Sequence, residues 1–587
     1  MAGMVANYTQ LKRFVAVGVA LWFLMLFGLS RMFLSSESDS EHVGKSLEQV
    51  LGRIATAGEK QQFKTAMDKI EKLQQQNDIL QRRLQDLRNP ALQRPVAEIG
   101  HAAADGGEYL VPSKEFEYSR RKLENGIVEF WRYASTHLKD LYETKDSNAA
   151  KALAKQMLDF MGEHKGVILA DINNLESAAG ITEWKLQKSL EMTRIVQNRL
   201  KNLQNPRNCA EARRLRCSIN KACGLGCQLH HATYCLIAGY ALNRTVILES
   251  KGWRYSKKGW ESVFLPLTKT CKSSDIGTPR AWRDDPENDK EPVIELPIVD
   301  NIQGASGNNK RPLWLPLAVP RDLFTRIHAF HKNPPIWWMG QIVSYLWRLQ
   351  PSTQKILNEL TTKMVFASPI VGVHVRRTDK VGTEAAKHEV SEYMEHVKAY
   401  FDQLDVTKKT AVRRVYVATD DSAAFHEIKK NYPDYEILGN TDSMDSAALN
   451  KRYSDASLIG VITDVHFLSQ SDHLVCTFSS QVCRLAYELM QARLPDAADF
   501  YNSLDDVYYY GGQNGHNVRA ILPHQAANPE EISFDKGDLL GLAGNHWDGY
   551  SVAQHKVTDR KGKFPSYKAE EHFVKYDMPH YEDRSDL

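Results

Sequence analysis

A cluster of basic residues follows a short apolar segment near the middle of the chain. Residues 371–376 alternate valine with glycine, histidine and arginine, which is typical of a buried strand. His374 and Arg376 lie two positions apart, so they share one face of that strand. Arg377 and Lys380 follow, and basic side chains at the carboxyl end of a parallel strand bind phosphate in α/β folds. The segment therefore predicts a phosphate-containing ligand, with a solvated run of charges as the alternative.

A second strand end in the same half of the chain also has polar residues. The predicted strand 473–478 leads into Ser480 and Gln481, just before a predicted helix over 482–491. Free backbone N–H groups and the helix dipole favour phosphate at such a position. As plain helix caps, these residues would need no ligand.

The basic segment also carries a resemblance to a known family. Residues 374–386, HVRRTDKVGTEAA, resemble the donor-binding segment of the α-1,6-fucosyltransferases. These are Golgi enzymes that transfer fucose from GDP-fucose to the innermost GlcNAc of N-glycans. The similarity extends from about Cys209 to Tyr567. The shorter pattern H-x-R-R-x-D is shared with bacterial chitooligosaccharide fucosyltransferases, so the longer string is the specific signal.

The resemblance implies transfer with inversion at the fucose. Arg376, supported by Arg377 and Lys380, would neutralise the charge that grows on the leaving β-phosphate. Glu384 matches the general base of the family, which takes the proton from the GlcNAc 6-hydroxyl while Lys380 tunes or relays it. Asp379 is the rival base, although its place beside the arginines favours a structural ion pair.

A divalent metal is the alternative way to neutralise the diphosphate. Asp420 and Asp421 follow a predicted strand over 414–419, and adjacent carboxylates can hold Mg²⁺ or Mn²⁺. The pair is not a spaced Asp-x-Asp motif, and the three basic side chains can meet the charge instead. The resemblance implies metal independence, so we expect no cofactor beside the donor substrate.

The residues and the resemblance together assign further residues to the two substrates. The predicted donor-binding residues are His374, Arg376, Arg377, Gly224, Gly226, Tyr255, Asp420, Asp421, Val461, Asp464, Ser480 and Gln481. The predicted acceptor-binding residues are Lys221, Asp300, Tyr393, Asp505 and His546.

Two of these assignments concern the guanine base. Leu225 replaces the aromatic residue that the family has between Gly224 and Gly226, so Tyr255 is the better candidate to stack on guanine. A tight turn held by cysteines is the alternative interpretation of the two glycines. The carboxylate of Asp464 can accept hydrogen bonds from both N1–H and the 2-amino group of guanine.

The composition sets broad limits on the protein. A chain of 587 residues is long enough for several domains. Its 75 basic and 72 acidic residues leave a net charge of +3. Such a balance gives no reason to expect nucleic acid as a partner.

The cysteines indicate an oxidising compartment. All eight lie beyond residue 200, and their number is even. Cys223 and Cys227 have zinc-like spacing, so a metal site is the alternative. Spacing alone leaves the connectivity open. The pairs that the resemblance implies are Cys209–Cys271, Cys217–Cys235, Cys223–Cys227 and Cys476–Cys483.

The amino-terminal region predicts a membrane anchor. Residues 14–34 are apolar except at Arg31 and are long enough to span a bilayer. Lys12 and Arg13 precede them and acidic residues follow, so the positive-inside rule keeps the amino terminus cytosolic. We expect a single-pass type II protein of the Golgi membrane with a luminal catalytic region. Cleavage as a signal peptide is the alternative.

Two helical regions are predicted after the anchor. Apolar residues between 63 and 87 follow heptad spacing, which favours a coiled coil with Asn77 at a core position, although a solvated single helix is the alternative. Residues 111–204 have helical spacing with a break near 162–166, which favours a bundle for self-association. We therefore expect a homodimer.

The rest of the chain predicts a mixed α/β fold with a GT-B-like catalytic body of two lobes. In the first lobe we expect a helix over 228–240 and strands over 245–249 and 295–300. In the second, Rossmann-like lobe, helices over 391–404 and from Ser422 alternate with the strands. The expected domains are a cytoplasmic tail (1–13), the anchor (14–34), a stem (35–110), a helical region (111–204), a first lobe (205–360), a GDP-fucose-binding lobe (361–510), a β module (511–575) and a tail (576–587).

The β module, residues 515–572, resembles an SH3 domain with five short strands. Residues 520–524 lack both groove tyrosines, and His546 replaces the first tryptophan of the usual pair. Because polyproline ligands need those aromatic residues, we expect no peptide binding. In the resembled family the module helps to hold the glycan. Two alternatives stay open, namely a fucosyltransferase for chitooligosaccharide or a protein hydroxyl, and a membrane-tethered scaffold.

Overall fold

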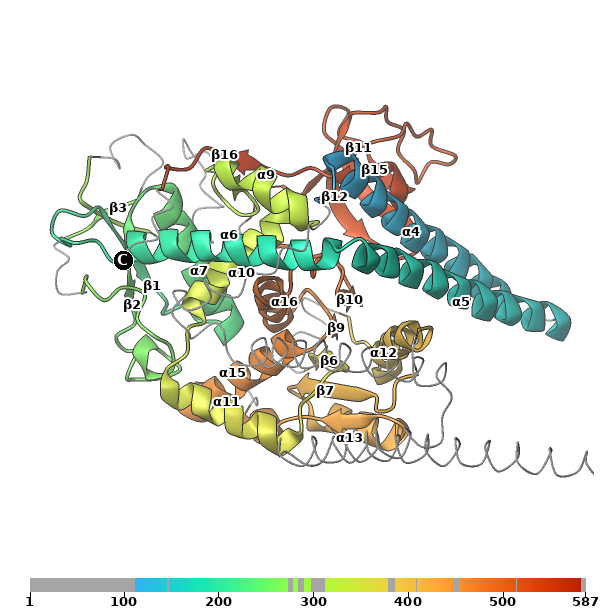
Figure 1. Cartoon of the computed structure of the whole chain (residues 1–587), viewed down its shortest axis with the longest axis horizontal. Helices are drawn as coiled ribbons and strands as arrows, with labels where there is room; N and C mark the ends of the chain where they lie inside the picture. The colour runs from blue at the N-terminus through green and yellow to red at the C-terminus, as the bar shows by residue number, and fades with distance from the viewer. Residues whose placement is uncertain are drawn as a thin grey trace, which may run out of the picture. The chain divides into compact units, whose positions relative to one another are not determined.

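The computed structural model describes residues 111–144, 147–272, 278–282, 290–296, 312–377, 386–407, 409–446, 453–511, 513 and 515–581 (Figure 1). The anchor expected at 14–34 and the coiled coil expected in the stem lie outside the described residues. The same holds for the candidate site residues Asp300, Asp379, Lys380 and Glu384. Within the described ranges, no helix is both long and apolar enough to cross a membrane.

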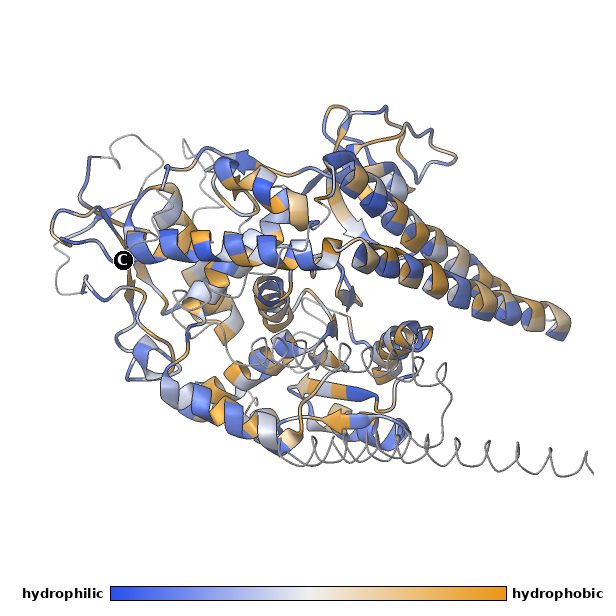
Figure 2. Ribbon diagram, viewed as in Figure 1, coloured by the Kyte–Doolittle hydropathy of each residue, from blue (hydrophilic) through white to orange (hydrophobic). Residues whose placement is uncertain are grey.

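Three long helices come first: α4 (Lys114–Thr144), α5 (Asn148–Ala178) and α6 (Ile181–Gln204). Helices α4 and α5 pack against each other, and hydrophobic and hydrophilic residues alternate along both (Figure 2). The break expected near 162–166 is absent, because α5 continues through both glycines. A Cβ atom would lie 3.2 Å from the Trp131 ring at Gly162 and 3.2 Å from Gln403 at Gly166. Close packing at these two positions offsets the low helix propensity of glycine.

The first sheet is parallel, with the strand order β2-β1-β4-β3. Its strands are β1 (Arg214–Ser218), β2 (Thr245–Glu249), β3 (Arg280–Ala281) and β4 (Val293–Glu295). The strand predicted at 245–249 is confirmed. The helix predicted from Gln228 begins earlier, as α7 (Leu225–Ala241), and so includes part of the glycine turn. Strand β4 ends at Glu295, and residues 297–300 of the strand predicted at 295–300 lie outside the described residues.

The second sheet is also parallel, with the order β10-β9-β6-β7-β8. Its strands are β6 (Ile370–Val375), β7 (Arg414–Thr419), β8 (Glu436–Leu438), β9 (His473–Cys476) and β10 (Tyr501–Ser503). Its helices are α12 (Val390–Asp405), α13 (Ser422–Asn431), α14 (Thr441–Ser446), α15 (Asp455–Gln470) and α16 (Gln481–Arg493). As the alternation predicts, Val371, Val373 and Val375 pack with the α12 residues Val397 and Phe401. Strand β9 is shorter than predicted, because the chain turns after Cys476.

The two lobes share a hydrophobic core. The first lobe adds β5 (Val319–Pro320) and the helices α9 (Arg321–Phe330), α10 (Pro334–Leu346) and α11 (Pro351–Met364). Every residue of α10 is buried, and this helix packs against both α7 and α16. The contact with α16 needs Gly340, because a Cβ atom there would lie 2.4 Å from the Glu488 carbonyl oxygen. The relative position of α7 and α16 is therefore set by close packing.

The carboxyl-terminal module is an antiparallel sheet of five strands in the order β14-β13-β12-β11-β15, as the SH3 resemblance predicts. The strands are β11 (Asn517–Ala520), β12 (Leu539–Asn545), β13 (Tyr550–His555), β14 (Lys561–Pro565) and β15 (Ala569–Glu571). After it, β16 (Lys575–Tyr576) pairs with β5 of the first lobe. The Arg132 guanidinium of α4 lies 4.7 Å from the centre of the Trp547 ring, so the module also contacts the helical region.

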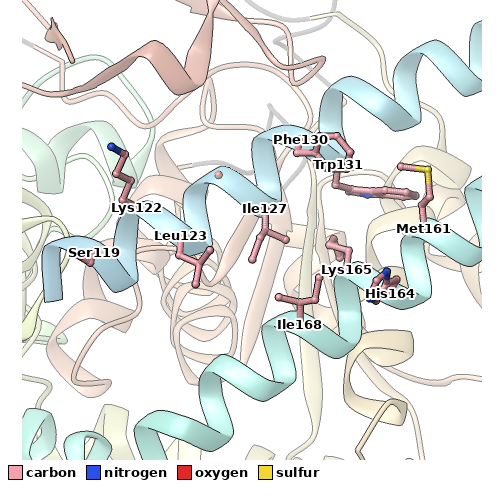
Figure 3. A pocket seen from close by; sticks show the side chains of 11 residues that line it. Ser119, Lys122, Leu123, Ile127, Phe130, Trp131, Met161, His164, Lys165 and Ile168 are labelled. Carbon is pink, nitrogen blue, oxygen red and sulfur yellow. The ribbon is translucent and has the colours of Figure 1, made fainter. Parts of the chain in front are cut away.

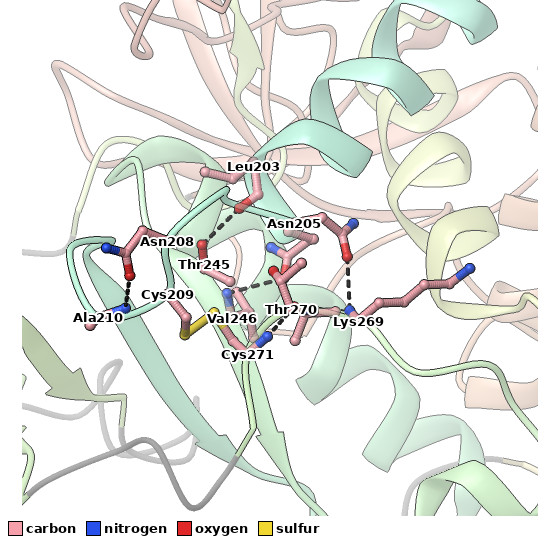
Figure 4. The surroundings of a disulfide bond; sticks show 12 residues. Leu203, Asn205, Asn208, Cys209, Ala210, Thr245, Val246, Lys269, Thr270 and Cys271 are labelled. Atoms are coloured by element: carbon pink, nitrogen blue, oxygen red, sulfur yellow. Dashed lines mark hydrogen bonds between the residues drawn. A yellow bond between two sulfur atoms is a disulfide. The ribbon is translucent and has the colours of Figure 1, made fainter. Parts of the chain in front are cut away.

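All eight cysteines form disulfides, in the four pairs that the resemblance implies. Cys223 and Cys227 are therefore bonded to each other, and their spacing does not mark a zinc site. Figure 4 shows the Cys209–Cys271 bond, which joins the segment after α6 to the loop after β2. Beside it, Thr245 Oγ1 donates a hydrogen bond of 2.7 Å to the Leu203 carbonyl oxygen.

Candidate active site

The carboxyl ends of β6 and β7 bring three predicted residues together. The Arg376 guanidinium donates a hydrogen bond to Asp420, whose side chain is 3% exposed. The other Asp420 oxygen accepts the backbone N–H of Arg377 at 2.9 Å. One carboxylate therefore holds both the side chain of the first arginine and the backbone of the second.

His374 lies on the same strand face as Arg376, as predicted. Its side chain is buried, and its Nδ1 atom has no hydrogen-bond partner among the described residues. Burial and the positive charge of Arg376 lower the pKa of His374 to about 4. The imidazole is therefore neutral near pH 7, and Nδ1 is an orphaned polar atom beside the basic cluster.

Arg377 is surrounded by carboxylates. Its guanidinium lies 3.6 Å from Asp421, 3.6 Å from Glu389 and 4.0 Å from Glu427. It also donates a hydrogen bond of 3.0 Å to the His388 carbonyl oxygen. These contacts connect the end of β6 to the starts of α12 and α13, so Arg377 braces the loop region.

Asp420 and Asp421 are engaged by the protein itself. Asp420 contacts the two arginines, and Asp421 accepts the Ala423 N–H at 3.0 Å as the cap of α13. In the part of the chain that the structure describes, no group of three or more His, Cys, Asp or Glu residues has a metal-binding arrangement. The two carboxylates fit an arginine-holding role more closely than a pair of metal ligands.

The turn between β9 and α16 is held by a disulfide and by a carboxylate. The disulfide Cys476–Cys483 spans it. The Asp505 carboxylate accepts the backbone N–H groups of Phe478 at 2.8 Å and Ser479 at 3.1 Å. Ser480, which is 3% exposed, then begins α16 without a side-chain cap bond. The amino terminus of α16 thus lies in a fixed frame, as a phosphate-binding helix end requires.

Asp505 and His546 lie in neighbouring segments, as predicted. The Trp547 indole N–H donates to the Asp505 carbonyl oxygen at 3.1 Å, and His546 beside it is exposed. The Asp505 carboxylate also accepts bonds from Ser503 Oγ and from the Asp506 N–H. Three of these four bonds fall on Oδ1 and one on Oδ2. Asp505 therefore supports the turn, and Oδ2 can accept one further hydrogen bond.

The glycine turn of the first lobe faces the start of α16. A Cβ atom at Gly226 would lie 2.9 Å from the Gln481 Cβ atom, whereas one at Gly224 would meet no atom within 4 Å. Gly226 therefore allows two helices to approach, and Gly224 borders open space. Leu225 is 2% exposed and belongs to the hydrophobic core.

Tyr255 lies in the hydrophobic core beside other aromatic rings. Its side chain is 3% exposed, and its hydroxyl oxygen accepts the Leu225 N–H at 2.9 Å. The rings of Trp253 and Tyr453 lie beside it, with centroids at 5.8 and 5.3 Å. The sequence could not show this burial, which argues against the stacking role predicted for Tyr255.

Asp464 lies on α15, one turn after Val461. Tyr416 and Ser443 each donate a hydrogen bond to its carboxylate, at 2.9 and 2.5 Å. Burial raises the pKa of Asp464 to about 7, and the two hydroxyl donors limit the rise. Each oxygen with one donor can accept another hydrogen bond, so the group remains suited to guanine.

The other acceptor candidates lie at the edges of this region. The Lys221 carbonyl accepts the Gln228 side-chain amide at 2.6 Å, in the turn that precedes α7. Tyr393 on α12 is 2% exposed, and burial raises the pKa of its hydroxyl. Tyr393 therefore lies in the core, and direct contact with a sugar would need a local rearrangement.

A buried polar network between the lobes was not predicted. His230 Nδ1 lies 2.5 Å from Gln481 Oε1, and His230 Nε2 lies 3.0 Å from the Glu488 carboxylate. Tyr508 donates a hydrogen bond of 2.5 Å to the same carboxylate. The signal in the sequence was a charged residue inside the apolar helix 482–491, because a buried carboxylate requires partners.

Comparisons with known proteins agree with this organisation. The family described as alpha-(1,6)-fucosyltransferase N- and catalytic domains matches residues 4–509, and a variant SH3 domain family matches residues 520–570. An alpha-(1,6)-fucosyltransferase of Drosophila melanogaster is 44% identical over 481 residues, which are 81% of this chain and 76% of the relative. One of Caenorhabditis elegans is 36% identical over 570 residues, which are 95% and 97%.

Solved fucosyltransferases are more distant. The fucosyltransferase NodZ from Bradyrhizobium is 12% identical, covers 47% of this chain and 92% of its own, and has a TM-score of 0.27. POFUT1 in complex with GDP-fucose is 12% identical, covers 48% and 94%, and has a TM-score of 0.29. The sequence relatives decide the assignment, and they place the chain among the glycosyltransferases. It belongs to the α-1,6-fucosyltransferase family.

Proposed function

We propose that the protein transfers fucose from GDP-fucose, with inversion, to O6 of the innermost GlcNAc of N-linked glycans. The observation that carries this proposal is the arrangement at the end of β6, where Asp420 holds Arg376 beside the orphaned Nδ1 atom of His374. That arrangement presents fixed positive charge and a ring nitrogen that can donate a hydrogen bond in its N–H form, at the edge where parallel sheets bind phosphates. The family membership supplies the reaction that uses such a site.

Each part of the reaction has a candidate group. Arg376 stabilises the charge of the GDP leaving group, and the amino terminus of α16 binds phosphate oxygens. Asp464 and Val461 select guanine. Glu384 removes the proton from the acceptor hydroxyl with help from Lys380, and Asp379 is the rival base.

We also propose that the reaction needs no divalent metal. The contacts of Asp420 and Asp421 with arginine side chains and helix N–H groups support this proposal. The same lobes would form a GT-B-like body. Each lobe has a parallel sheet, and Gly226 of the first lobe lies against Gln481 of the second, which supports this proposal. The residues on the acceptor side would then be Lys221, Asp300, Tyr393 and His546, with Asp505 in support.

A homodimer is the proposed assembly. Helices α4 and α5 border an open pocket of about 560 Å³, lined mainly by apolar side chains (Figure 3). Leu123 is 56% exposed and Phe130 is 64% exposed, although both are large apolar residues on one long helix. A second copy of this helical pair would cover them.

Light scattering after size exclusion tests the proposed homodimer. It should give a dimer for the wild type and a monomer for Phe130→Glu. Val557→Glu is the control, because Val557 is 84% exposed and lies outside the helical pair.

The function is tested with the full chain in detergent, GDP-fucose, EDTA and an asparagine-linked biantennary glycan ending in GlcNAc. Fucose linked to O6 of the innermost GlcNAc is the expected product. Transfer that requires Mn²⁺ would return Asp420 and Asp421 to a metal role. Transfer only to chitooligosaccharide or to a protein hydroxyl would show that the proposed acceptor is wrong. A chain that binds no GDP would favour the alternative of a membrane-tethered scaffold. Localisation of the tagged chain in cells tests the proposed Golgi membrane anchor.

A further inference from the structure

A hydrogen-bond network connects the first lobe to the start of α16. Its centre is His230 of α7, whose ring lies between two residues of α16 that are seven positions apart. The ring nitrogen Nδ1 faces the Gln481 amide oxygen, and Nε2 faces the Glu488 carboxylate. Both facing groups present oxygen atoms, so a ring nitrogen that carries a hydrogen can donate to the oxygen it faces.

The network is buried and supported on every side. The side chain of His230 is 8% exposed and that of Glu488 is fully buried. Tyr508 donates to Glu488, and the Tyr510 hydroxyl donates to the backbone carbonyl oxygen of His230. The buried Glu488 carboxylate favours this orientation of the imidazole, because rotation of the ring would remove one of its two partners.

The orientation of His230 determines the orientation of Gln481. The amide oxygen of Gln481 faces the His230 ring. The NH₂ group of Gln481 is bonded to the same carbon atom as that oxygen, so it points away from the ring. Gln481 is the first residue of α16, at the helix end where free N–H groups bind phosphate. The close approach at Gly226 restricts Gln481 further, because the backbone of α7 lies directly against it.

We propose that His230 is a positioning residue, which holds Gln481 so that its amide NH₂ group donates to the diphosphate of the donor. This inference rests on the proposed GDP-fucose site at the amino end of α16. It makes donor binding dependent on a residue of the opposite lobe. The fixed amide adds a side-chain donor to the helix N–H groups without a change of conformation on binding.

Two substitutions at His230 distinguish a role in orienting the Gln481 amide from a role in supporting the packing between the helices. Gln places its amide where the imidazole has Nε2, so His230→Gln keeps the contact with Glu488 and loses the contact with Gln481. Asn places its amide where the imidazole has Nδ1, so His230→Asn keeps Gln481 and loses Glu488. If His230 positions Gln481, His230→Gln should bind GDP more weakly than His230→Asn does. If His230 only supports the packing, His230→Asn should be the weaker binder.

The test is calorimetric titration of GDP into the full chain in detergent, with a thermal unfolding curve for each variant. We expect His230→Gln to unfold near the wild-type temperature and to bind GDP about 10-fold more weakly. We expect His230→Asn to unfold at a lower temperature, because Glu488 loses a partner, and to recover most of the GDP affinity. In turnover assays, His230→Gln should raise the KM for GDP-fucose and leave the KM for the glycan unchanged.

A double variant provides the control. Gln481→Ala should weaken GDP binding as much as His230→Gln does, and the two changes together should have no larger effect. Wild-type GDP affinity in His230→Gln, or losses in both His230 variants that follow their unfolding temperatures, would overturn the inference. If the wild-type chain itself binds no GDP, the proposed function fails before this inference is reached.

Discussion

Two aspartates of the second lobe, Asp420 and Asp464, are held in opposite ways. Asp420 follows β7 and contacts the Arg376 guanidinium and the Arg377 backbone. Asp464 lies on α15 and receives hydrogen bonds from two neutral hydroxyl groups. The Asp420 carboxylate is paired with a positive charge. The Asp464 carboxylate has no positively charged group among the hydrogen-bond partners described above.

The comparison shows how aspartate can have two different roles in one site, depending on the groups that surround its carboxylate. Beside an arginine, as at Asp420, a carboxylate forms an ion pair that fixes the position of the guanidinium. Beside hydroxyl groups, burial dominates and raises the pKa of Asp464 to about 7. The account therefore assigns Asp420 to hold the phosphate-binding arginine and Asp464 to recognise the base.

A third carboxylate gives the largest expected effect. If Glu384 is the general base, Glu384→Gln should lower kcat about 10²–10⁴-fold and leave GDP affinity unchanged, because only the proton acceptor is lost. Single-turnover rates and GDP titration measure the two quantities. Asp379→Asn is the matched control, and a larger loss of kcat in that variant would transfer the role to Asp379.

The arginine held by Asp420 should have the next largest effect. Arg376→Ala should lower kcat about 10²–10³-fold, because the charge on the leaving phosphate loses its partner. Arg376→Lys keeps the charge but cannot donate two parallel hydrogen bonds, so its kcat should lie in between. Steady-state kinetics at saturating donor measure both, and a kcat within threefold of wild type for Arg376→Ala would contradict the role.

The two glycines of the first lobe should differ from each other. Gly226→Ala forces a Cβ atom against Gln481, so we expect a loss of about 1–3 kcal/mol in the free energy of unfolding and weaker GDP binding. Gly224→Ala meets no protein atom, so stability should be unchanged and GDP binding alone should weaken. Thermal unfolding and GDP titration test the pair. Unaltered GDP affinity in Gly224→Ala would remove Gly224 from the donor site.

The smallest effect concerns the pH dependence of base recognition. Ionised Asp464 accepts the guanine N–H groups, and protonated Asp464 accepts them poorly. With its pKa at about 7, the dissociation constant of GDP should rise about 10-fold between pH 8 and pH 6. Asp464→Asn should bind more weakly and show a flatter profile. An equal slope in wild type and variant would show that another group titrates.

Local patterns in the sequence predicted the framework of the site. The strand 414–419 and the shared face of His374 and Arg376 follow from alternation, which depends on neighbouring residues alone. The continuous α5 helix and the buried position of Tyr255 were not predictable in this way, because both depend on packing against distant segments. The resemblance supplied the disulfide pairs, which spacing left open.

The polar network between the lobes was also not predictable from the sequence, because it depends on packing between distant segments. His230 and Glu488 are separated by 258 residues, and neither residue stands in a recognisable motif. Gly226 was predicted as a donor contact, but its tight approach to Gln481 is a property of two packed helices. A histidine and a glutamate within apolar helices were the available signals, and their pairing required the fold.

The most direct test of the account is an experimental structure of the chain with GDP bound. We expect the β-phosphate within hydrogen-bond distance of Arg376 and of the amino terminus of α16, and the guanine edge on Asp464. A GDP molecule that contacts neither Arg376 nor Asp464, or a guanine stacked on a displaced Tyr255 ring, would contradict the assignment of the two aspartates.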